Sequence, residues 1–267
     1  MPTTYETLGV SPSDPNITKL YGERTAKTSC QYFISYVTKT ANILDVGCGP
    51  GGITADLAKI AKEGRTIGVD ISEAVIEQAT AAFSDIPNLK FQVADATDLK
   101  DFADNSFDIV HCHQVLMHSP DPGPITILKE FYRVCKPGGF IAARENSNSV
   151  VLSLKPDLPL LRAYWERCLL FVPKIGGHLQ AGRDLEGWAE EAGWGAVGGK
   201  IIATKSPASS PGHLLRVTGP AVDQALHWNL GTREELAEWA EAWKEWEDTE
   251  GHEWYLEAGE IICWKGK

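Results

Sequence analysis

The chain has 267 residues, of which 43% are hydrophobic and 23% charged, and its formal net charge is −11. The composition is ordinary for a soluble globular protein, and the negative charge argues against nucleic-acid and anionic-membrane partners, which require a basic surface. No apolar run approaches the roughly 20 residues of a membrane helix, and the first residues form no secretory signal. We therefore expect a cytoplasmic protein without stable membrane insertion.

The cysteines are scattered along the chain without a C-x-x-C pair. This spacing predicts neither a zinc cluster nor a disulfide framework. We expect reduced thiols and no bound metal. The cysteines are Cys30, Cys48, Cys112, Cys135, Cys168 and Cys263.

A short apolar run at residues 43–46 leads into a dense glycine loop that includes Gly47, Gly49 and Gly51. Residues 53–61 then carry apolar side chains at helical spacing. A strand, a glycine turn and a helix in this order favour a nucleoside-bearing cofactor, because glycine lets the backbone approach a ligand closely. The unpaired N–H groups of the helix start face the same place.

Strands and helices alternate from residue 42 onward. This alternation predicts an α/β fold with a parallel sheet covered by helices on both faces. We expect strands at residues 43–46, 66–70, 89–93, 107–113 and 140–145, and helices at residues 53–61, 72–83 and 124–135.

The segments outside this alternating core are expected to be mainly helical. The sequence predicts helices at residues 17–36, 158–171, 182–191, 220–229 and 233–247, strands at residues 200–205 and 254–264, and a break at residues 206–212. In the helix at residues 233–247, a stripe of apolar side chains on one face predicts that the helix packs on its own domain. The stripe consists of Leu236, Trp239, Trp243 and Trp246.

We expect a single domain over residues 1–267, because a chain of this length can bury one large core. An N-terminal helical segment is expected at residues 1–40 and a cofactor-binding core at residues 41–147. Residues 148–267 are expected to supply cap insertions and the last strands. We expect a monomer or a homodimer.

The glycine pattern alone admits two kinds of cofactor. Gly47, Gly49 and Gly52 satisfy the G-x-G-x-x-G pattern of nicotinamide-binding domains. Asp70, at the end of the second strand, could bind the ribose hydroxyls of a nicotinamide cofactor or of S-adenosyl-L-methionine. Neither feature discriminates between the two.

Three further features favour S-adenosylmethionine, and one of them is the long run from Phe107 to Gly139. Asp95, at the end of the third strand, is placed to meet the amino group of an adenine. The spacing Gly47-x-Gly49-x-Gly51, preceded by Asp45, is tighter than a pyrophosphate requires. S-adenosylmethionine has no pyrophosphate, and its amino and carboxylate groups can meet the loop backbone directly.

Several motifs together resemble one enzyme family. They lie at residues 44–51, 68–70, 94–96, 113–118, 133–139 and 181–185. The chain resembles the class I S-adenosylmethionine-dependent methyltransferases, in particular the ubiquinone/menaquinone-biosynthesis type and its fungal small-molecule branch. The resemblance implies a Rossmann-like, seven-stranded, mostly parallel sheet with an antiparallel last strand. The cofactor would lie across the carboxyl ends of the first four strands.

The resemblance also assigns residues to the cofactor. The glycines would flank its methionine moiety, Asp70 would hold the ribose and Asp95 the adenine. Asp45 would orient the loop or reach the amino group through water. Tyr21 and Arg24 would fold over the site, or simply pack on the core. The expected cofactor-binding residues are Tyr21, Arg24, Asp45, Gly47, Gly49, Gly51, Asp70, Ile71, Asp95, Ala96 and His113.

Methyl transfer is an in-line displacement at an activated carbon, so positioning the acceptor can supply much of the rate. A base is needed only if the acceptor must lose a proton. His118 and His113 are the candidate bases, and Gln114 could orient the acceptor. Alternatively, the turn at residues 119–122 holds His118 in a structural role, and His113 packs at its strand end.

The acceptor pocket is expected to come from the segments outside the cofactor core. The candidate substrate-binding residues are Tyr164, Trp165, Phe171, His178, Arg183 and Trp228. The aromatic candidates suit a flat hydrophobic acceptor, but they could equally be core residues. The histidine and the arginine could contact an acidic substrate or serve the structure. Arg144 and Glu145 either form a buried pair or face the substrate.

The predicted function is methyl transfer from S-adenosylmethionine to a small molecule, such as a secondary metabolite or a quinone-like compound. The methylated atom, oxygen, nitrogen, sulfur or carbon, stays open. One alternative is an NAD(P)-dependent oxidoreductase, which only the formal glycine pattern favours. Another is a protein that binds S-adenosylmethionine without transferring its methyl group.

Overall fold

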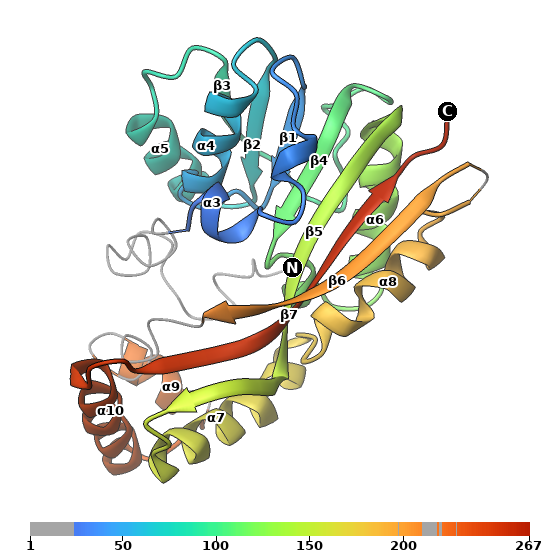
Figure 1. The fold of residues 1–267 in the computed structure, drawn as a ribbon. Coiled ribbons are helices and arrows are strands. Elements are labelled where there is room, and N and C mark those ends of the chain that lie inside the picture. Colours follow the sequence, from blue (N-terminus) through green and yellow to red (C-terminus); the bar gives the residue numbers. More distant parts are fainter. Residues whose placement is uncertain (1–23, 197, 210–217, 219–220, 228) are drawn as a thin grey trace.

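The computed structural model describes residues 24–196, 198–209, 218, 221–227 and 229–267. Its centre is a seven-stranded sheet with the strand order β3-β2-β1-β4-β5-β7-β6 (Figure 1). The strands are β1 (Ile43–Val46), β2 (Thr66–Asp70), β3 (Leu89–Val93), β4 (Phe107–His113), β5 (Cys135–Lys155), β6 (Lys200–Ser209) and β7 (Glu253–Trp264).

Helices of very different length connect and cover these strands. The α-helices are α3 (Ala26–Ser29), α4 (Gly52–Ile60), α5 (Glu73–Ala82), α6 (Gly123–Val134), α7 (Pro159–Phe171), α8 (Ala181–Glu191), α9 (Ala221–His227) and α10 (Arg233–Asp248). The 3-10 helices are η1 (Ile34–Tyr36), η2 (Leu116–His118) and η3 (Val172–Ile175). Among the described helices, none is both long enough and apolar enough to cross a membrane.

Most of the sheet is parallel, and its last strand is antiparallel. β3, β2, β1, β4 and β5 run parallel to one another, whereas β7 runs antiparallel to both β5 and β6. Every residue of β1 and β2 is buried, which is why neither strand shows a regular alternation of apolar and polar residues in the sequence. The predicted fold class is confirmed.

Helices cover both faces of the sheet, as predicted. On one face, Leu128 of α6 and Leu185 of α8 join Val110 of β4 in a core cluster. On the opposite face, Leu57 of α4 packs in a second cluster with Ile109 of β4. Neighbouring residues of β4 therefore pack into the cores on opposite faces of the sheet, because successive side chains of a strand point to opposite faces.

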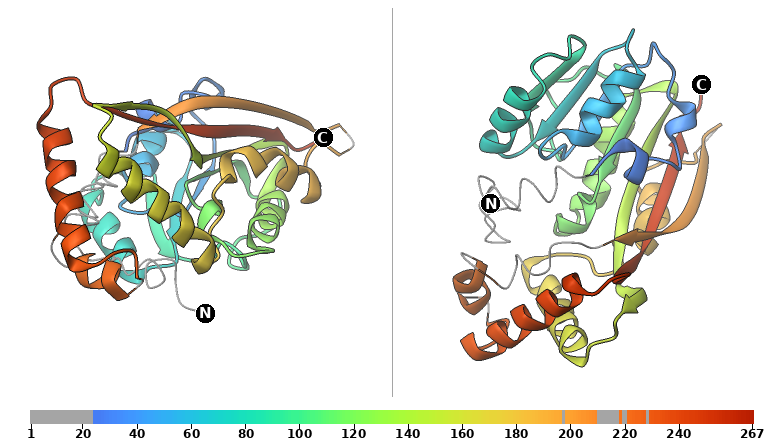
Figure 2. Two further views of the ribbon diagram at one scale, coloured as in Figure 1. Left: turned by 90° about the horizontal axis from the view of Figure 1, so that it is seen from below. Right: turned by 60° about the vertical axis from the view of Figure 1, so that its left-hand side comes forward.

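A separate apolar core lies beyond the carboxyl edge of the sheet, and we call it the cap core. α7, α9 and α10 form it with the end of β5 and the start of β7 (Figures 1 and 2). The Tyr164 ring lies 5.5 Å from the ring of Trp239 and 5.7 Å from that of Trp243. The aromatic stripe of α10 thus packs within its own domain, as predicted.

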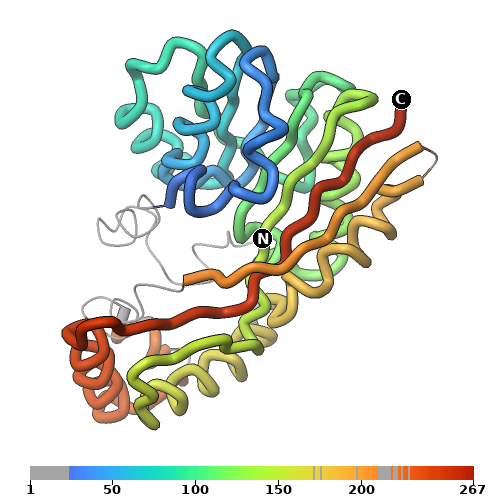
Figure 3. The backbone as a smooth tube through the Cα atoms, in the orientation of Figure 1, coloured from blue at the N-terminus to red at the C-terminus, as the bar shows by residue number. Residues whose placement is uncertain are grey.

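Three predicted boundaries are wrong. The described part of the helix predicted at residues 17–36 consists of α3 and η1, with a turn between them. β5 continues past residue 145 to Lys155, and β6 continues through the predicted break to Ser209 (Figure 3). Both extensions pair with β7. Because β7 lies far along the chain, the sequence near these extensions does not indicate that they form strand.

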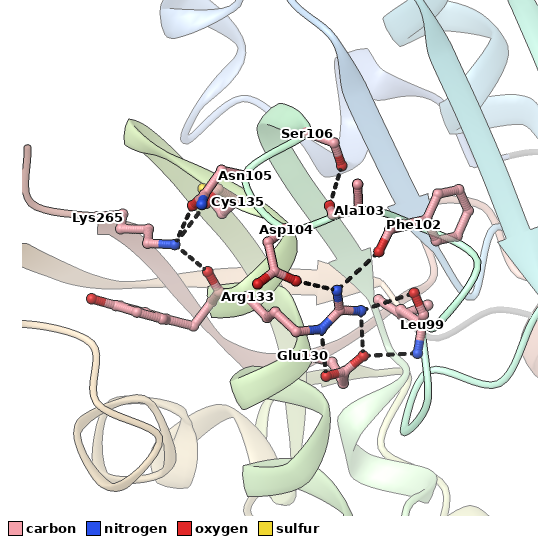
Figure 4. A network of polar contacts seen from close by, with 11 residues as sticks. Leu99, Phe102, Ala103, Asp104, Asn105, Ser106, Glu130, Arg133, Cys135 and Lys265 are labelled. Carbon is pink, nitrogen blue, oxygen red and sulfur yellow. Dashed lines mark hydrogen bonds and ion pairs between the residues drawn. The ribbon is translucent and has the colours of Figure 1, made fainter.

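Arg133 of α6 fixes the chain between β3 and β4 (Figure 4). Its Nε and Nη2 donate to the Glu130 carboxylate at 2.9 and 2.8 Å. Nη1 donates to Asp104 at 2.7 Å and to the Phe102 carbonyl oxygen at 2.9 Å. Nη2 also donates to the Leu99 carbonyl oxygen at 2.9 Å. The planar guanidinium suits such multiple bonds, so one side chain ties this loop to α6.

Replacing Arg133 with Met is expected to lower the free energy of unfolding by about 1–3 kcal/mol, because charge-assisted hydrogen bonds to the loop are lost. Denaturant unfolding measures the change. Arg233→Met is the matched control, since Arg233 pairs with Asp223 on the surface at 3.2 Å. We expect the control to leave stability unchanged, and equal losses in the two variants would contradict this role of Arg133.

Candidate functional site

The carboxyl ends of β1, β2, β3 and β4 meet around one pocket. Parallel strands bring these ends to one edge, where ligands of open α/β sheets bind. Most of the predicted cofactor-binding residues line it: Arg24, Asp45, Gly47, Gly49, Asp70, Ile71, Asp95, Ala96 and His113. Gln114 and His118 line it as well. Tyr21 lies outside the described residues.

The glycine loop holds Gly47, Gly49 and Gly51 in left-handed backbone conformations, and the last two have different roles. Gly49 has a φ of +52°, and a Cβ there would meet nothing within 4 Å. Gly51 has a φ of +86°, and a Cβ there would lie 2.6 Å from the Phe91 ring. Gly49 therefore leaves room for a ligand beside the backbone. Gly51 is buried behind the pocket and serves the start of α4.

Asp70 joins the glycine loop to the start of α5. Its Oδ2 accepts the N–H of Gly49 at 3.1 Å, and its Oδ1 accepts the N–H of Ser72 at 3.1 Å. The side chain is buried but still borders the pocket. Because an ionised carboxylate has about four acceptor positions, ribose hydroxyls could also donate to it.

The ends of β2 and β3 combine an apolar surface with one acidic group. Asp95 Oδ1 accepts the N–H and the hydroxyl of Thr97 at 2.8 and 2.7 Å, which fixes the carboxylate at the pocket. Ile71 is 42% exposed although it is apolar, and Ala96 also lines the pocket. An adenine could pack on these apolar groups and donate from its amino group to Asp95.

His113 is a buried, neutral imidazole at the end of β4. Burial and then the charges of Arg24, Arg144 and His111 lower the pKa of His113 well below its ordinary value. Its Nδ1 is buried and has no hydrogen-bond partner among the described residues. Since the ring borders the pocket, it could bind a ligand group, although its low pKa makes it a weak base.

The turn after β4 brings the other two predicted catalytic residues to the pocket. Gln114 has a φ of +57°, and its Oε1 accepts from Arg24 Nη2 at 2.6 Å. This bond holds the Arg24 side chain against the turn after β4. His118 ends η2 and lines the pocket together with Ser119.

A buried chain of contacts, which sequence reasoning missed, supports the glycine loop. His111 Nδ1 donates to Asp45 Oδ1 at 2.7 Å, and the Thr54 hydroxyl donates to Asp45 Oδ2 at 2.6 Å. Cys30 Sγ lies 3.7 Å from His111 Nε2. Burial lowers the pKa of His111, but Cys30 and Asp45 outweigh it and raise that pKa to about 10. A histidine cation therefore holds Asp45 at the end of β1.

Arg144 and Glu145 do not pair with each other, because neighbouring side chains of β5 point to opposite faces. Arg144 Nε donates to Glu260 Oε1 of β7 at 3.0 Å. Glu145 Oε1 accepts the N–H groups of Val115 and Leu116, both at 2.8 Å. Burial raises the pKa of Glu145 to about 7, against the effect of these donors. Glu145 thus anchors the turn after β4.

The predicted substrate-binding aromatic residues do not line this pocket. Tyr164 and Trp165 are 2% and 7% exposed and belong to the cap core. Trp165 Nε1 also donates to the Asn148 carbonyl oxygen at 3.0 Å. Core packing therefore accounts for both residues. The side chain of Phe171 and all of Trp228 lie outside the described part of the chain.

His178 and Arg183 contact protein groups outside the pocket. His178 Nε2 donates to the Ser119 carbonyl oxygen, and its backbone N–H donates to the Met117 carbonyl oxygen, both at 2.9 Å. Arg183 pairs with Glu257 at 2.6 Å near the surface. Both residues thus have structural partners, and His178 supports a segment that borders the pocket.

The chain is similar to known methyltransferases. Residues 43–139 match a family described as a methyltransferase domain. An uncharacterized methyltransferase of Schizosaccharomyces pombe is 32% identical over 93% of each chain. A demethylmenaquinone methyltransferase of Staphylococcus aureus is 36% identical over 54% of this chain and 56% of its own. Phosphoethanolamine N-methyltransferase 2 of Haemonchus contortus, solved with S-adenosyl-L-methionine, shares the fold with a TM-score of 0.61. The two sequences are 15% identical, and the match covers 100% of this chain and 61% of that chain.

Replacing Gly49 with Ala is expected to weaken S-adenosylmethionine binding about tenfold or more, because the new methyl group fills the open space beside the loop. Calorimetric titration measures the Kd. Gly251→Ala is the matched control, since Gly251 has a φ of +73° and a Cβ there also meets nothing within 4 Å. The control shares the backbone strain but lies outside the pocket, so its Kd should not change. Wild-type affinity in the Gly49 variant would contradict the placement.

The free energy of unfolding is expected to fall by about 2 kcal/mol between about pH 6.5 and 8.5 because of His111. Its pKa of about 10 in the folded state exceeds its ordinary value of 6.5. The stabilisation by protonated His111 is therefore complete at pH values below its ordinary pKa. It is lost as the pH rises toward the pKa in the folded state. Denaturant unfolding at several pH values measures this slope. His111→Gln should flatten it, and equal slopes in the two proteins would contradict the Asp45–His111 pair.

Proposed function

We propose that this chain, which belongs to the S-adenosylmethionine-dependent methyltransferases, transfers a methyl group to a small-molecule acceptor. The membership rests on the fungal relative matched over nearly the whole chain and on the matching family. The enzyme class and the methyl donor follow from that membership. The size and class of the acceptor are the proposal.

The observation that carries the proposal is the order of polar groups along one pocket. The sheet order β3-β2-β1-β4 places Asp95, Asp70 and Gly49 in sequence along the carboxyl edge. These groups suit, in turn, the adenine, the ribose and the methionine end of an extended donor. His113 follows on β4, so the reactive methyl group would face the ends of β4 and β5. An acceptor must therefore approach from that side.

Two observations favour a small molecule as the acceptor. The relative from Staphylococcus aureus carries demethylmenaquinone, a quinone and not a macromolecule, in its name. A net charge of −11 disfavours nucleic acid as the acceptor. A secondary metabolite or a quinone-like compound is the class we propose.

The protein's part in such a reaction is mainly positioning. The sulfonium of bound S-adenosylmethionine supplies an activated methyl group, and correct orientation of the acceptor can contribute about 7–11 kcal/mol to lowering the barrier. Arg24 holds Gln114 at the pocket by a hydrogen bond of 2.6 Å. Gln114 and the neutral His113 could then orient the acceptor through hydrogen bonds.

Two alternative functions are separated by titration and product analysis. An NAD(P)-dependent oxidoreductase would bind a reduced nicotinamide cofactor tightly. A non-catalytic protein would bind S-adenosylmethionine but form no S-adenosylhomocysteine. We expect binding of S-adenosylmethionine, none of the nicotinamide cofactor, and S-adenosylhomocysteine formation when dialysable small molecules of a cell extract are added. Tight binding of the nicotinamide cofactor alone would contradict the proposal.

Replacing Asp70 with Ala is expected to raise the Kd for S-adenosylmethionine about tenfold or more, because charge-assisted hydrogen bonds to the ribose are lost. Asp70→Asn keeps the shape and one acceptor oxygen, so its loss should be smaller. Asp157→Ala is the control, since Asp157 pairs with Arg162 on the surface. Calorimetry gives all three Kd values, and an unchanged Kd in the Asp70→Ala variant would remove Asp70 from the site.

A further inference from the structure

Three buried polar atoms near the end of β4 have no hydrogen-bond partner among the described residues. They are the hydroxyl of Tyr32, Nδ1 of His113 and Oδ1 of Asn146. A buried polar group without a partner destabilises the folded state. Three such groups from separate segments, gathered in one place, indicate that a ligand supplies the missing hydrogen bonds.

The strand register gathers these three side chains on one face of the sheet. His113 of β4 is paired with Arg144 of β5, and Asn146 follows two residues later in regular pairing with β7. Paired residues of neighbouring strands, and residues two apart in one strand, share a face. His113, Arg144 and Asn146 therefore lie side by side at the carboxyl edge.

Tyr32 lies over the same part of the sheet. Burial raises the pKa of the Tyr32 hydroxyl well above its ordinary value, and the nearby Cys30, Cys112, Glu260 and Arg144 also act on it. Its neighbour Phe33 packs on the His111 ring with a centroid distance of 5.2 Å, and His111 precedes His113 by two residues on the same face. The segment between α3 and η1 thus covers this polar patch from the outer side.

The surroundings of His113 disfavour an ammonium group. Burial and the cations Arg24, Arg144 and His111 keep the imidazole neutral. The same burial and the same neighbours would penalise a protonated amine beside it.

The available partners also disfavour a carboxylate. Asn146 Oδ1 can only accept a hydrogen bond, and an unprotonated imidazole nitrogen likewise presents a lone pair. Arg144, the nearest guanidinium on β5, is already paired with Glu260 at 3.0 Å. An ionised carboxylate can only accept hydrogen bonds, so it cannot donate to these two acceptors. A neutral hydroxyl group can donate to Asn146 Oδ1 or to the His113 nitrogen.

We propose that Tyr32, His113 and Asn146 bind the methyl acceptor, and that this acceptor is a neutral compound methylated on a hydroxyl oxygen. The inference rests on the proposed methyltransferase function and names its substrate class. The reacting hydroxyl donates to His113 Nδ1. A second hydroxyl group of the same molecule donates to Asn146 Oδ1, and the Tyr32 hydroxyl donates to an oxygen of that molecule.

The reaction balances with these groups alone and the methyl donor. A lone pair of the acceptor oxygen forms the bond to the methyl carbon, and the carbon–sulfur bond breaks with its electron pair going to sulfur. The hydroxyl proton passes to His113 Nδ1, so the imidazole gains the positive charge that the sulfonium loses. The oxygen becomes strongly acidic as the new bond forms, so a weak base is sufficient. The protonated ring then releases its proton to solvent.

Matched acceptors test the substrate class. The wild-type protein is incubated with S-adenosylmethionine labelled in its methyl group and with catechol or 2-naphthol. Benzoate, 2-naphthoate, benzylamine and 2-naphthylmethylamine are the charged counterparts. We expect label only in the methyl ethers of the hydroxyl compounds. Label only in a carboxylate or an amine product, or no transfer while S-adenosylhomocysteine still binds, would overturn the hydroxyl assignment.

Two substitutions test the residues with catechol as the probe, because catechol carries a second hydroxyl group, and a third substitution is the control. Tyr32→Phe and Asn146→Leu each remove a buried atom that has no hydrogen-bond partner among the described residues, so the melting temperature should stay equal or rise. Both should lower kcat/KM at least about tenfold without changing the Kd of S-adenosylhomocysteine. Thr66→Val is the control, because Thr66 Oγ1 is also buried without a partner among the described residues. It stands at the start of β2, away from the carboxyl edge, and should keep wild-type kcat/KM.

The outcomes separate this inference from the broader function. Wild-type kcat/KM in both Tyr32→Phe and Asn146→Leu would overturn the acceptor site, as would a lower melting temperature of both variants with a parallel loss of cofactor binding. Failure of the wild-type protein to bind S-adenosylhomocysteine would instead contradict the proposed function itself.

Discussion

The pairing of β1 with β4 is the constraint on which the site depends. The parallel register sets Asp45 beside His111, and the buried pair of opposite charges holds the chain where it leaves β1 for the glycine loop. In a buried environment such a pair attracts strongly, and losing one partner leaves the other charge uncompensated. Asp70 holds the other side of the loop through the N–H of Gly49. Two carboxylates on neighbouring strands therefore fix the loop before any ligand binds.

The long pairing of β5 with β7 connects the pocket to the cap core. Near the pocket, β5 carries Arg144, bound to Glu260 of β7, and Glu145, bound to the turn after β4. Farther along, the same strand places Leu154 in the cap core. The two regions therefore share continuous strands (Figure 3). This continuity positions the proposed acceptor groups rigidly, because Asn146 stands in the paired part of β5.

Local sequence patterns predict the parallel core well, because β1, β2 and β4 are short segments rich in apolar residues and each ends at or next to a glycine or a polar residue. The acidic residues Asp70 and Asp95 are recognisable for the same reason. The extension of β5 is not predictable in this way, since Asn146 and Ser147 are polar and become strand only by pairing with β7. The role of His111 depends likewise on partners that the register supplies. Aromatic side chains such as those of Tyr164 and Trp165 suit a core and a pocket wall equally, so residue type alone does not distinguish the two.

The central claim is that one donor molecule spans the carboxyl ends of β1, β2 and β3 with its methyl group toward β4. Hydrogen exchange of backbone amides, with and without saturating S-adenosylmethionine, tests it most directly. The account predicts slower exchange in residues 47–51, 70–72 and 94–97 together, with unchanged exchange in α10. Protection confined to one of these segments, or found only in the cap core, would contradict the account.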